Sequence, residues 1–538
     1  MKKLIFLLLI TMTISCTKKE KVDTIVINAN IYTVNSNFGK AEAFAIKDGK
    51  IINIGTNLEI QSKYAPTYIN DVKWKTIVPG FIDAHCHFYG LGLQQQKVDL
   101  TGTKSFDEVL QKIVDFQKEK NTNFITGRGW DQNDWEVKEF PTKEKLDKLF
   151  PNTPVAITRI DGHALLVNQA AIDLAGVTTT TKFSGGEILQ KNGKLTGVFI
   201  DNPMDLIYAI VPRPLKKEQI KALQDAEIIC FSYGLTTVDD AGLSRETIEL
   251  IDSLQQSGTL KIKMYAMVAN TPKDVDYYLK KGIVKTDRLN VRSIKVYADG
   301  ALGSRGAALK KPYSDQHNHF GAILSTPEEY MNIAKQIVAS DYQMNSHAIG
   351  DSANYLMLKT YKEVLKSKKD RRWRIEHAQI LDPEDIKYFD NILPSVQPTH
   401  ATSDMYWAED RVGPTRIKSS YAYKDLLNTY GKIALGTDFP IEKVNPFLTF
   451  YASVARKDLN NYPENGFQME NALTREETLK GMTIWAAYSN FEENEKGSIE
   501  VGKFADFIIL DKNIMEVDEA EIPYIRVNET YVNGEKVN

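Results

Sequence analysis

The chain has 538 residues, of which 42% are hydrophobic and 25% are charged, and its 67 basic and 70 acidic residues give a formal net charge of −3. This composition excludes a disordered or fibrous protein and provides enough apolar residues for a large core. Since the charges are nearly balanced and form no long run of either sign, neither nucleic acid nor a charged membrane surface is indicated as a partner.

Residues 1–22 differ in kind from the rest of the chain. A basic start precedes an apolar run from Leu4 to Ile10, which is typical of a secretory signal and too short to span a membrane. The residues around Cys16 resemble a bacterial lipoprotein signal, in which the cysteine becomes the lipidated first residue. We therefore predict a signal peptide and polar linker over 1–22, and an exported lipoprotein on the periplasmic or cell-surface side. Simple secretion is the alternative, because Thr13 stands where leucine is commonest.

Both ends of the remaining chain have a sequence pattern that is typical of a small β domain. Residues 23–78 contain short alternating runs, such as Thr24 to Ala29, that are broken by Asn, Gly and Asp. Residues 490–538 show the same pattern, with an apolar run from Ala505 to Leu510. We predict that these two segments pair in one composite β-sandwich domain, into which residues 79–489 are inserted.

The middle of the chain alternates apolar runs with helical segments, which indicates βα units, an α/β fold and a parallel sheet. Eight candidate strands fit a closed (β/α)8 TIM-like barrel: Gly80 to His87, Leu235 to Asp240, Lys261 to Met267, Ser293 to Asp299, Met344 to Ala348, Trp373 to Gln379, Ile392 to Gln397 and Lys432 to Asp438. The first gap is far longer than one helix requires, so residues 90–225 are predicted to form a large cap insertion after strand 1.

The first barrel strand ends in two histidines one residue apart, His85 and His87. Successive side chains of a strand point to opposite faces, so these two imidazoles share a face and can converge on one ion. Two buried, hydrogen-bonded histidines would be the simpler interpretation of an isolated pair. Here, however, four of the chain's 8 histidines come at the ends of predicted strands, since His347 and His377 do so as well.

Other polar residues occur in the same place on later strands. Lys295 lies on the fourth strand and Asp438 ends the eighth. The active sites of such barrels lie at the C-terminal ends of the strands. Alone, each residue has a simpler interpretation: a core histidine at 377, a surface lysine at 295 or a turn-forming aspartate at 438. Their convergence on one end of the barrel favours a metal site.

Two segments resemble the amidohydrolase superfamily of metal-dependent hydrolases: Pro79 to His87, which contains His85 and His87, and Gly436-Thr437-Asp438. Further segments are similar to the YtcJ-like amidohydrolases: Gly127 to Gln132, Asp161-Gly162-His163-Ala164 with Val167-Asn168, Ile294 to Arg305, and Gln397 to His400. Members of that branch have been assigned hydrolysis of amides, including N-substituted formamides. The resemblance implies a hydrolase that acts on an amide-like carbon–nitrogen bond of a small molecule.

By position, the resemblance implies two divalent metal ions, with zinc as the expected metal. His85, His87 and Asp438 would hold one ion and His347 and His377 the other, with Lys295 bridging them as an N-carboxylated lysine. A metal-activated hydroxide would attack the substrate carbonyl. Asp438 would be the catalytic residue that passes the proton to the leaving amine.

Three further residues are expected to bind substrate: His163 in the cap, Arg305 and His400. Asp299 is a further candidate, and His317 and His319, in a polar loop, are expected to be exposed.

The sequence leaves alternatives to this function open. A deaminase or cyclic imidase of the same superfamily would use a similar site. A non-catalytic, metal-binding surface lipoprotein would keep the fold without the reaction. The expected partner is a small-molecule substrate, with membrane contact only through lipid on Cys16, and a homo-oligomer is left open.

Overall fold

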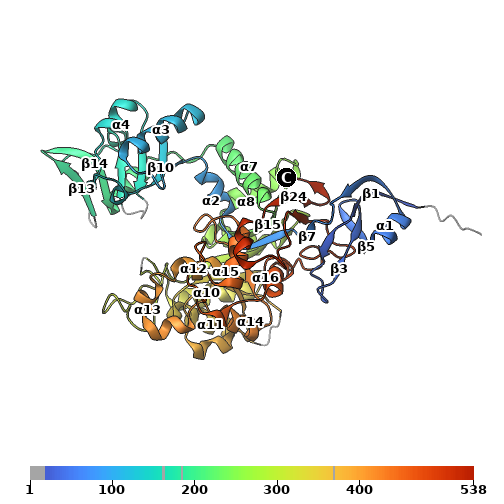
Figure 1. Ribbon diagram of the computed structural model, residues 1–538. Coiled ribbons are helices and arrows are strands. Elements are labelled where there is room, and N and C mark those ends of the chain that lie inside the picture. The colour runs from blue at the N-terminus through green and yellow to red at the C-terminus, as the bar shows by residue number, and fades with distance from the viewer. Residues whose placement is uncertain (1–18, 160–163, 183–185, 304, 367–369) are drawn as a thin grey trace, which may run out of the picture. The chain divides into compact units, whose positions relative to one another are not determined.

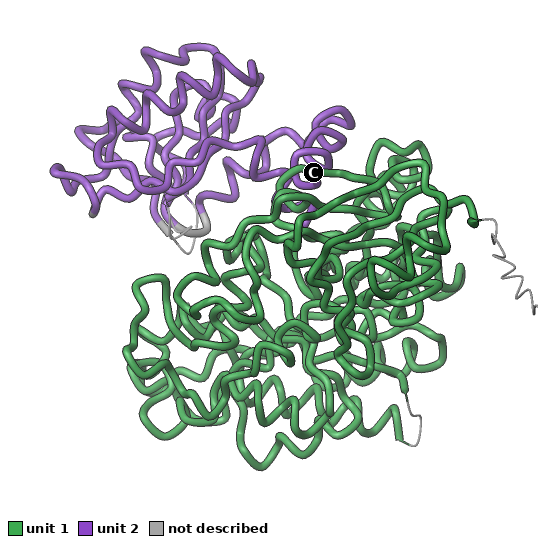
Figure 2. Tube along the Cα trace, turned by 45° about the vertical axis from the view of Figure 1, so that its right-hand side comes forward, with its two compact units in different colours: residues 1–87, 228–538 green, residues 88–227 purple. Residues whose placement is uncertain are grey.

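The computed structural model describes residues 19–538 except 160–163, 183–185, 304 and 367–369. The chain divides into two compact units, residues 1–87 with 228–538 and residues 88–227 (Figures 1 and 2). Cys16 and the predicted signal lie outside the described residues. The first strand, β1 (Glu20–Ile27), begins inside the segment predicted as linker.

The larger unit contains a sheet of eight parallel strands, in the spatial order β22-β21-β20-β19-β18-β16-β15-β8. Their bounds are β8 (Phe81–Cys86), β15 (Leu235–Leu243), β16 (Lys263–Ala269), β18 (Leu289–Tyr297), β19 (Gln343–Ala348), β20 (Arg374–His377), β21 (Leu393–Val396) and β22 (Ala434–Leu435). The short β17 (Val284–Lys285) pairs with β18 from outside this path. Every predicted barrel strand is present and in the expected order, which confirms the parallel eight-stranded sheet.

The first and last strands of this sheet lie next to each other. The amide of Asp438 donates a hydrogen bond of 2.8 Å to the carbonyl of His85, and the amide of His87 donates one of 2.8 Å to the carbonyl of Phe439. The sheet is therefore a nearly closed TIM-like barrel. The two hydrogen bonds between its first and last segments are made where the predicted metal ligands lie.

The helices between the strands are amphipathic, as βα units require. They include α8 (Arg245–Gln256), α9 (Pro272–Lys281), α10 (Pro327–Val338), α11 (Asp351–Leu365) and α14 (Tyr423–Tyr430). In α8, Ile248, Ile251 and Leu254 are buried at a helical spacing. Thr326 and Glu329 form a capping box at the start of α10, which fixes where this helix begins.

Strands from the two chain ends pair with each other. One sheet has the order β25-β24-β23-β7-β2-β3, and β23 (Phe507–Leu510) runs antiparallel to β7 (Thr76–Pro79) with Phe507 opposite Pro79. The other strands of this sheet are β2 (Asn30–Tyr32), β3 (Lys40–Ala41), β24 (Val527–Val532) and β25 (Glu535–Lys536). A second sheet, β5-β4-β1-β6, consists of β1, β4 (Ala43–Lys47), β5 (Lys50–Gly55) and β6 (Tyr64–Asp71). Val26 and Phe44 of this second sheet share one buried cluster with Ile77 and Phe507 of the first.

Residues 88–227 have a six-stranded sheet and core clusters of their own. The spatial order of the strands is β13-β14-β12-β11-β10-β9. The bounds are β9 (Val98–Asp99), β10 (Ile125–Trp130), β11 (Val155–Arg159), β12 (Ala164–Val167), β13 (Gly186–Lys191) and β14 (Lys194–Asp201), with helices α3 (Phe106–Lys120), α4 (Glu144–Leu149) and α5 (Gln169–Leu174). The unit therefore has the core of a small separate domain, inserted directly after His87.

Among the described residues, no helix combines the length and the apolarity that crossing a membrane would require.

Candidate active site

His85, His87 and Asp438 converge at the C-terminal end of the barrel. Nε2 of His87 lies 3.3 Å from Oδ1 of Asp438, and Nε2 of His85 lies 3.7 Å from the same oxygen. One ligand atom from each of the three residues lies within 4.8 Å of the other two. The His-x-His spacing and the end of the last strand therefore produce one compact group of nitrogen and oxygen donors.

Asp83 connects the first strand to the last and so holds this group together. Its carboxylate accepts hydrogen bonds from the amide and the hydroxyl of Thr437, at 3.0 and 2.7 Å, and from the amide of His85 at 3.2 Å. Gly436 has no room for a side chain, because a Cβ there would lie 2.5 Å from the His85 nitrogen and 2.9 Å from Oδ1 of Asp83. These contacts explain why aspartate stands two residues before His85 and glycine two before Asp438.

The Nδ1 atoms of three candidate ligands face hydrogen-bond acceptors, which turns each Nε2 toward the site. His85 Nδ1 lies 2.7 Å from the carboxylate of Glu376, and His87 Nδ1 lies 3.1 Å from the carbonyl of Ala241. His377 Nδ1 lies 2.7 Å from the amide oxygen of Gln397. A neutral imidazole that donates from Nδ1 presents a lone pair at Nε2, which is the form that binds a metal ion.

The remaining predicted ligands lie in the same cluster. Lys295 is fully buried, and its Nζ lies 3.0 Å from Nε2 of His85. The rings of His347 and His377 have centroids 4.5 Å apart, and those of His85 and His377 are 4.8 Å apart. The fold thus brings together all six residues predicted as ligands.

His400 also belongs to this cluster, although the sequence predicts it only as a substrate contact. Its Nε2 lies 3.3 Å from Oδ2 of Asp438, and its Nδ1 lies 3.2 Å from Glu442. His377, His400 and Asp438 form a second group whose donor atoms lie within 4.8 Å of one another. His400 is therefore placed to bind a second ion or to hold the Asp438 carboxylate.

The protonation states of His85, His347, His377 and Asp438 suit metal binding. Burial lowers the pKa of His347 to about 3 and holds those of His85 and His377 below their usual range, with nearby Lys295 or histidines adding to the effect. Burial raises the pKa of Asp438, but the hydrogen bond from His400 and the nearby histidines outweigh it and hold this pKa well below its usual value. Neutral imidazoles and an ionised carboxylate are the forms that ligate metal. His400 differs: burial lowers its pKa, but hydrogen bonds to Asp438 and Glu442 outweigh this and raise the pKa to about 10.

Two candidate ligands have strained backbones. His377 has φ +75° and Asp438 has φ +63°, in the left-handed region that non-glycine residues seldom adopt. The neighbouring Ala378 has φ +44°, so β20 ends at His377 rather than at the predicted Gln379. Such strain recurs at functional sites, where the surrounding structure enforces it.

A divalent ion fits this donor set. If His87 Nδ1 donates to the Ala241 carbonyl, a neutral His87 directs its Nε2 lone pair at the Asp438 carboxylate, so two acceptors face each other across 3.3 Å. Oδ1 of Asp438 and Nε2 of His347 are buried, and neither has a hydrogen-bond partner among the described residues. Imidazole nitrogens and a carboxylate are common zinc ligands, and a cation would satisfy these atoms.

Of the other two predicted substrate residues, only Arg305 lies within the described residues, and its guanidinium is paired with a carboxylate. Arg305 forms a two-bonded ion pair with Asp315, at 3.1 and 2.7 Å, and Asp315 also pairs with Arg411. Arg305 therefore crosslinks two segments of its own unit. His163 lies outside the described residues, and the predicted exposure of His317 is confirmed.

His319, predicted to be exposed with His317, is only partly so. Its Nε2 lies 2.8 Å from the carbonyl of Arg305, and its ring packs against Tyr313. Asp299 accepts hydrogen bonds from three backbone amides, those of Ala308, Ile349 and Gly350, and fixes the loops beside His347.

Glu376 and Gln397, which hold His85 and His377, were not predicted from the sequence. One signal was present: Arg374 and Glu376 alternate with the apolar Trp373 and Ile375 in a predicted barrel strand, and charged residues are seldom buried unless they are paired. The sequence could not indicate that the partner of Glu376 is His85, which lies 291 positions away.

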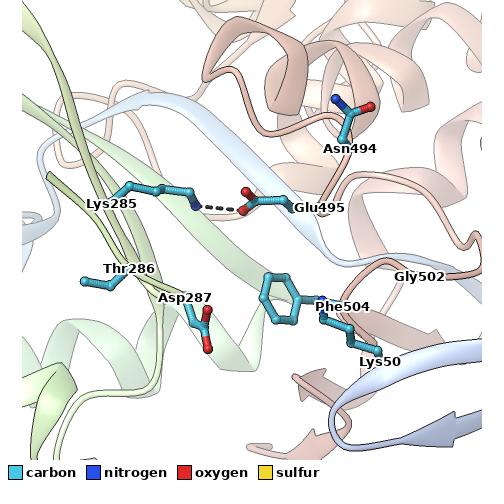
Figure 3. Close-up of a pocket in the computed structure, with 8 residues that line it drawn as sticks. All are labelled: Lys50, Lys285, Thr286, Asp287, Asn494, Glu495, Gly502 and Phe504. Atoms are coloured by element: carbon cyan, nitrogen blue, oxygen red, sulfur yellow. Dashed lines mark ion pairs between the residues drawn. The ribbon is translucent and has the colours of Figure 1, made fainter. Parts of the chain in front are cut away.

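A separate pocket of about 270 Å³ lies where the barrel strands begin, with Thr286 and Asp287 just before β18 (Figure 3). It is lined by Lys50, Lys285, Thr286, Asp287, Asn494, Glu495, Gly502 and Phe504, and the ion pair between Lys285 and Glu495 crosses the view. None of the candidate ligands lines this pocket, so it is distinct from the candidate active site.

Comparisons with known proteins agree with the geometry of the cluster. A family model described as "Amidohydrolase family" matches residues 71–538. The chain is 31% identical to "Putative amidohydrolase YtcJ" of Bacillus subtilis (strain 168), over 94% of this chain and 98% of that one. It is 24% identical to N-substituted formamide deformylase of Arthrobacter pascens, over 95% and 97% of the two chains.

The fold is also similar to that of a solved structure. The crystal structure of an uncharacterized metal-dependent hydrolase from Pyrococcus horikoshii OT3 matches with a TM-score of 0.79 and 28% identity, covering 92% of this chain and 99% of that one.

Proposed function

Because the chain belongs to the amidohydrolase family and is a hydrolase, we propose that it cleaves an amide-like carbon–nitrogen bond of a small molecule in a metal-dependent reaction. The observation that carries this proposal is the convergence of His85, His87 and Asp438 at the barrel end. N-substituted formamides and N-acyl amines are the substrates we favour, since a relative of similar length is named as a formamide deformylase.

In this proposal, His85, His87 and Asp438 hold one divalent ion, and His347 and His377 contribute to a second. His400 is an alternative ligand of the second ion, because it belongs to the second donor group. Lys295 would bridge the two sites as an N-carboxylated lysine, since a free ammonium cannot ligate a cation. Burial lowers the pKa of Lys295 to about 8, which favours the neutral amine that reacts with carbon dioxide.

When bound, such ions would lower the pKa of a coordinated water to about 7 and polarise the substrate carbonyl. Asp438 would accept a proton from the attacking water and pass it to the leaving nitrogen. The water oxygen bonds to the carbonyl carbon as the carbon–nitrogen bond breaks, so the products are a carboxylate, or formate, and an amine. His400, between Asp438 and Glu442, would keep the Asp438 carboxylate oriented during this transfer.

The two chain ends and the insertion after His87 would have separate roles. The two sheets that share Val26, Phe44, Ile77 and Phe507 would form a composite β-sandwich, and residues 88–227 would act as a cap that selects the substrate. The cap role is supported by the point of insertion, directly after His87 and hence at the C-terminal end of β8. The enzyme would be exported and attached to a membrane through Cys16.

Deamination of a cyclic amidine and hydrolysis of a cyclic imide are the alternatives within the family. A non-catalytic binding protein is disfavoured, because loss of activity usually erodes the ligand set first, and here the set is complete. The deciding experiment assays zinc-loaded protein against N-formyl and N-acyl amines, cyclic imides and amidines, with His87→Ala beside His317→Ala, a change at an exposed histidine. Turnover of the acyclic amides that is lost only in His87→Ala supports the proposal, whereas turnover of the imides or amidines alone selects an alternative.

A further inference from the structure

Glu376 is fully buried in the barrel interior, where it contacts His85. We propose that Glu376 is a positioning residue that fixes the ring of His85 so that Nε2 of this ring binds metal. The inference rests on the proposed function, because it assumes a metal ion at the His85, His87 and Asp438 group. Glu376 would hydrogen-bond to Nδ1, the ring nitrogen of His85 that does not bind the metal.

The contact between Glu376 and His85 is short and shielded from solvent. Oε2 of Glu376 lies 2.7 Å from Nδ1 of His85, and both side chains have an exposed fraction of 0%. The carboxylate can only accept a hydrogen bond here, so Nδ1 carries the proton and the Nε2 lone pair remains available. Nε2 faces the other candidate ligands, with Nζ of Lys295 at 3.0 Å and Oδ1 of Asp438 at 3.7 Å.

Glu376 differs in charge from the groups that accept hydrogen bonds from His87 and His377. His87 donates to the neutral carbonyl of Ala241 and His377 to the neutral amide of Gln397. An ionised acceptor makes a stronger hydrogen bond and increases the basicity of the imidazole more than a neutral acceptor does. Among these three histidines, His85 should therefore be the strongest electron donor to the ion.

A buried carboxylate needs a counter-charge, and Arg374 provides it. The guanidinium of Arg374 lies 3.9 Å from Oε1 of Glu376 and 3.0 Å from Oδ2 of Asp239. Asn490 accepts a hydrogen bond from Arg374 and donates one of 2.7 Å to Asp239. Arg374 and Glu376 stand two residues apart on β20 and therefore share the inward face of the strand.

The chain of contacts from Asn490 through Asp239, Arg374 and Glu376 to His85 is thus a continuous polar network inside the barrel. Removing one partner of such a network leaves the others uncompensated, so a purely structural role must be separated from positioning. Asp506 provides the matched control. Its carboxylate is also buried, forms an ion pair of 2.6 Å with Lys263 and contacts no histidine among the described residues.

The test compares Glu376→Gln with Asp506→Asn, each of which removes one buried charge and preserves size. The zinc dissociation constant is measured by competition with a chelator, and thermal unfolding of the metal-free proteins is measured in parallel. We expect Glu376→Gln to weaken zinc binding by about 10- to 100-fold, and Asp506→Asn to leave zinc binding at the wild-type value.

The other possible outcomes would overturn the positioning role of Glu376 or the proposed function. Wild-type affinity in Glu376→Gln overturns the positioning role, and an equal loss in both variants assigns the effect to stability alone. Wild-type protein that binds no zinc overturns the proposed function together with this inference. If Glu376→Gln does not fold, Glu376→Asp keeps the charge but shortens the reach to His85. Unchanged zinc affinity in that folded variant would overturn the positioning role.

Discussion

Nε2 of His87 and Oδ1 of Asp438 lie 3.3 Å apart and join the first and last segments of the barrel. With the proton of His87 on Nδ1, facing the Ala241 carbonyl, both atoms are acceptors. Two facing acceptors repel each other unless a cation or a proton lies between them. The closure of the barrel and the proposed metal site therefore depend on the same pair of residues.

Asp438→Asn should separate metal binding from catalysis. Asparagine preserves the size of the side chain and one ligating oxygen but removes the basic carboxylate. Turnover should fall on the order of 10²-fold or more, as expected for the loss of a positioned acid–base group, while part of the metal is retained. Asp382→Asn, a change at an exposed ion pair with Lys310, is the control for turnover and metal content. Near-wild-type hydrolysis by Asp438→Asn would assign the proton transfer to another residue, with His400 as the next candidate.

Lys295 should carry a carboxyl group in the active protein. Protein prepared with ¹³C-bicarbonate should show a carbamate carbon by NMR, and Lys295→Ala should lose that signal together with metal and activity. Lys263→Met changes an equally buried lysine that pairs with Asp506, so it should keep the signal. A wild-type spectrum without a carbamate resonance, from protein that is active and fully loaded, would remove Lys295 from the ligand set.

Gly436→Ala should destabilise the site end of the barrel. The added Cβ would meet the backbone of His85 and the carboxylate of Asp83, neither of which can move without disturbing the ligands. We expect the free energy of unfolding to fall by about 1–3 kcal/mol, as for other overpacked interiors, and metal affinity to fall with it. Gly39→Ala, where the nearest atom would lie at 3.4 Å, should change both much less. Equal effects of the two substitutions would contradict the close packing at Gly436.

The fold was largely predictable from the sequence, because each barrel strand is a local apolar run and the ligands stand at the ends of these runs. The strand ends were less predictable. β20 ends at His377, since positive φ angles at His377 and Ala378 interrupt the extended backbone, and β22 covers only Ala434–Leu435. Such angles are imposed by tertiary contacts that no local pattern records.

The ligands of the candidate site could be predicted from the sequence, but the residues that hydrogen-bond to these ligands could not. Glu376, Gln397 and Asp83 act on partners that only the closed barrel brings near them. Conversely, Arg305 stands in a segment that resembles the family, yet its guanidinium is engaged by Asp315. A residue's type and position indicate what it could contact, whereas the contact itself depends on the three-dimensional packing.

Cys16→Ser should change the location of the protein. If Cys16 carries lipid, the wild type will be found in the membrane fraction and the variant in the soluble extracytoplasmic fraction. Cys230→Ser changes a buried cysteine and should leave the protein with the membrane. Wild-type protein that is already soluble outside the cytoplasm would select simple secretion, and cytoplasmic protein with residues 1–15 intact would contradict export.

The most direct measurement is the metal content of purified protein by elemental analysis, after expression with ample zinc and with hydrolysis of an N-acyl amine followed in parallel. We expect close to two divalent ions per chain, loss of activity on chelation and its return when zinc is added. A stoichiometry near one would remove Lys295 and the second site from the ligand assignment. A stoichiometry near zero, or hydrolysis that persists without metal, would contradict the central claim.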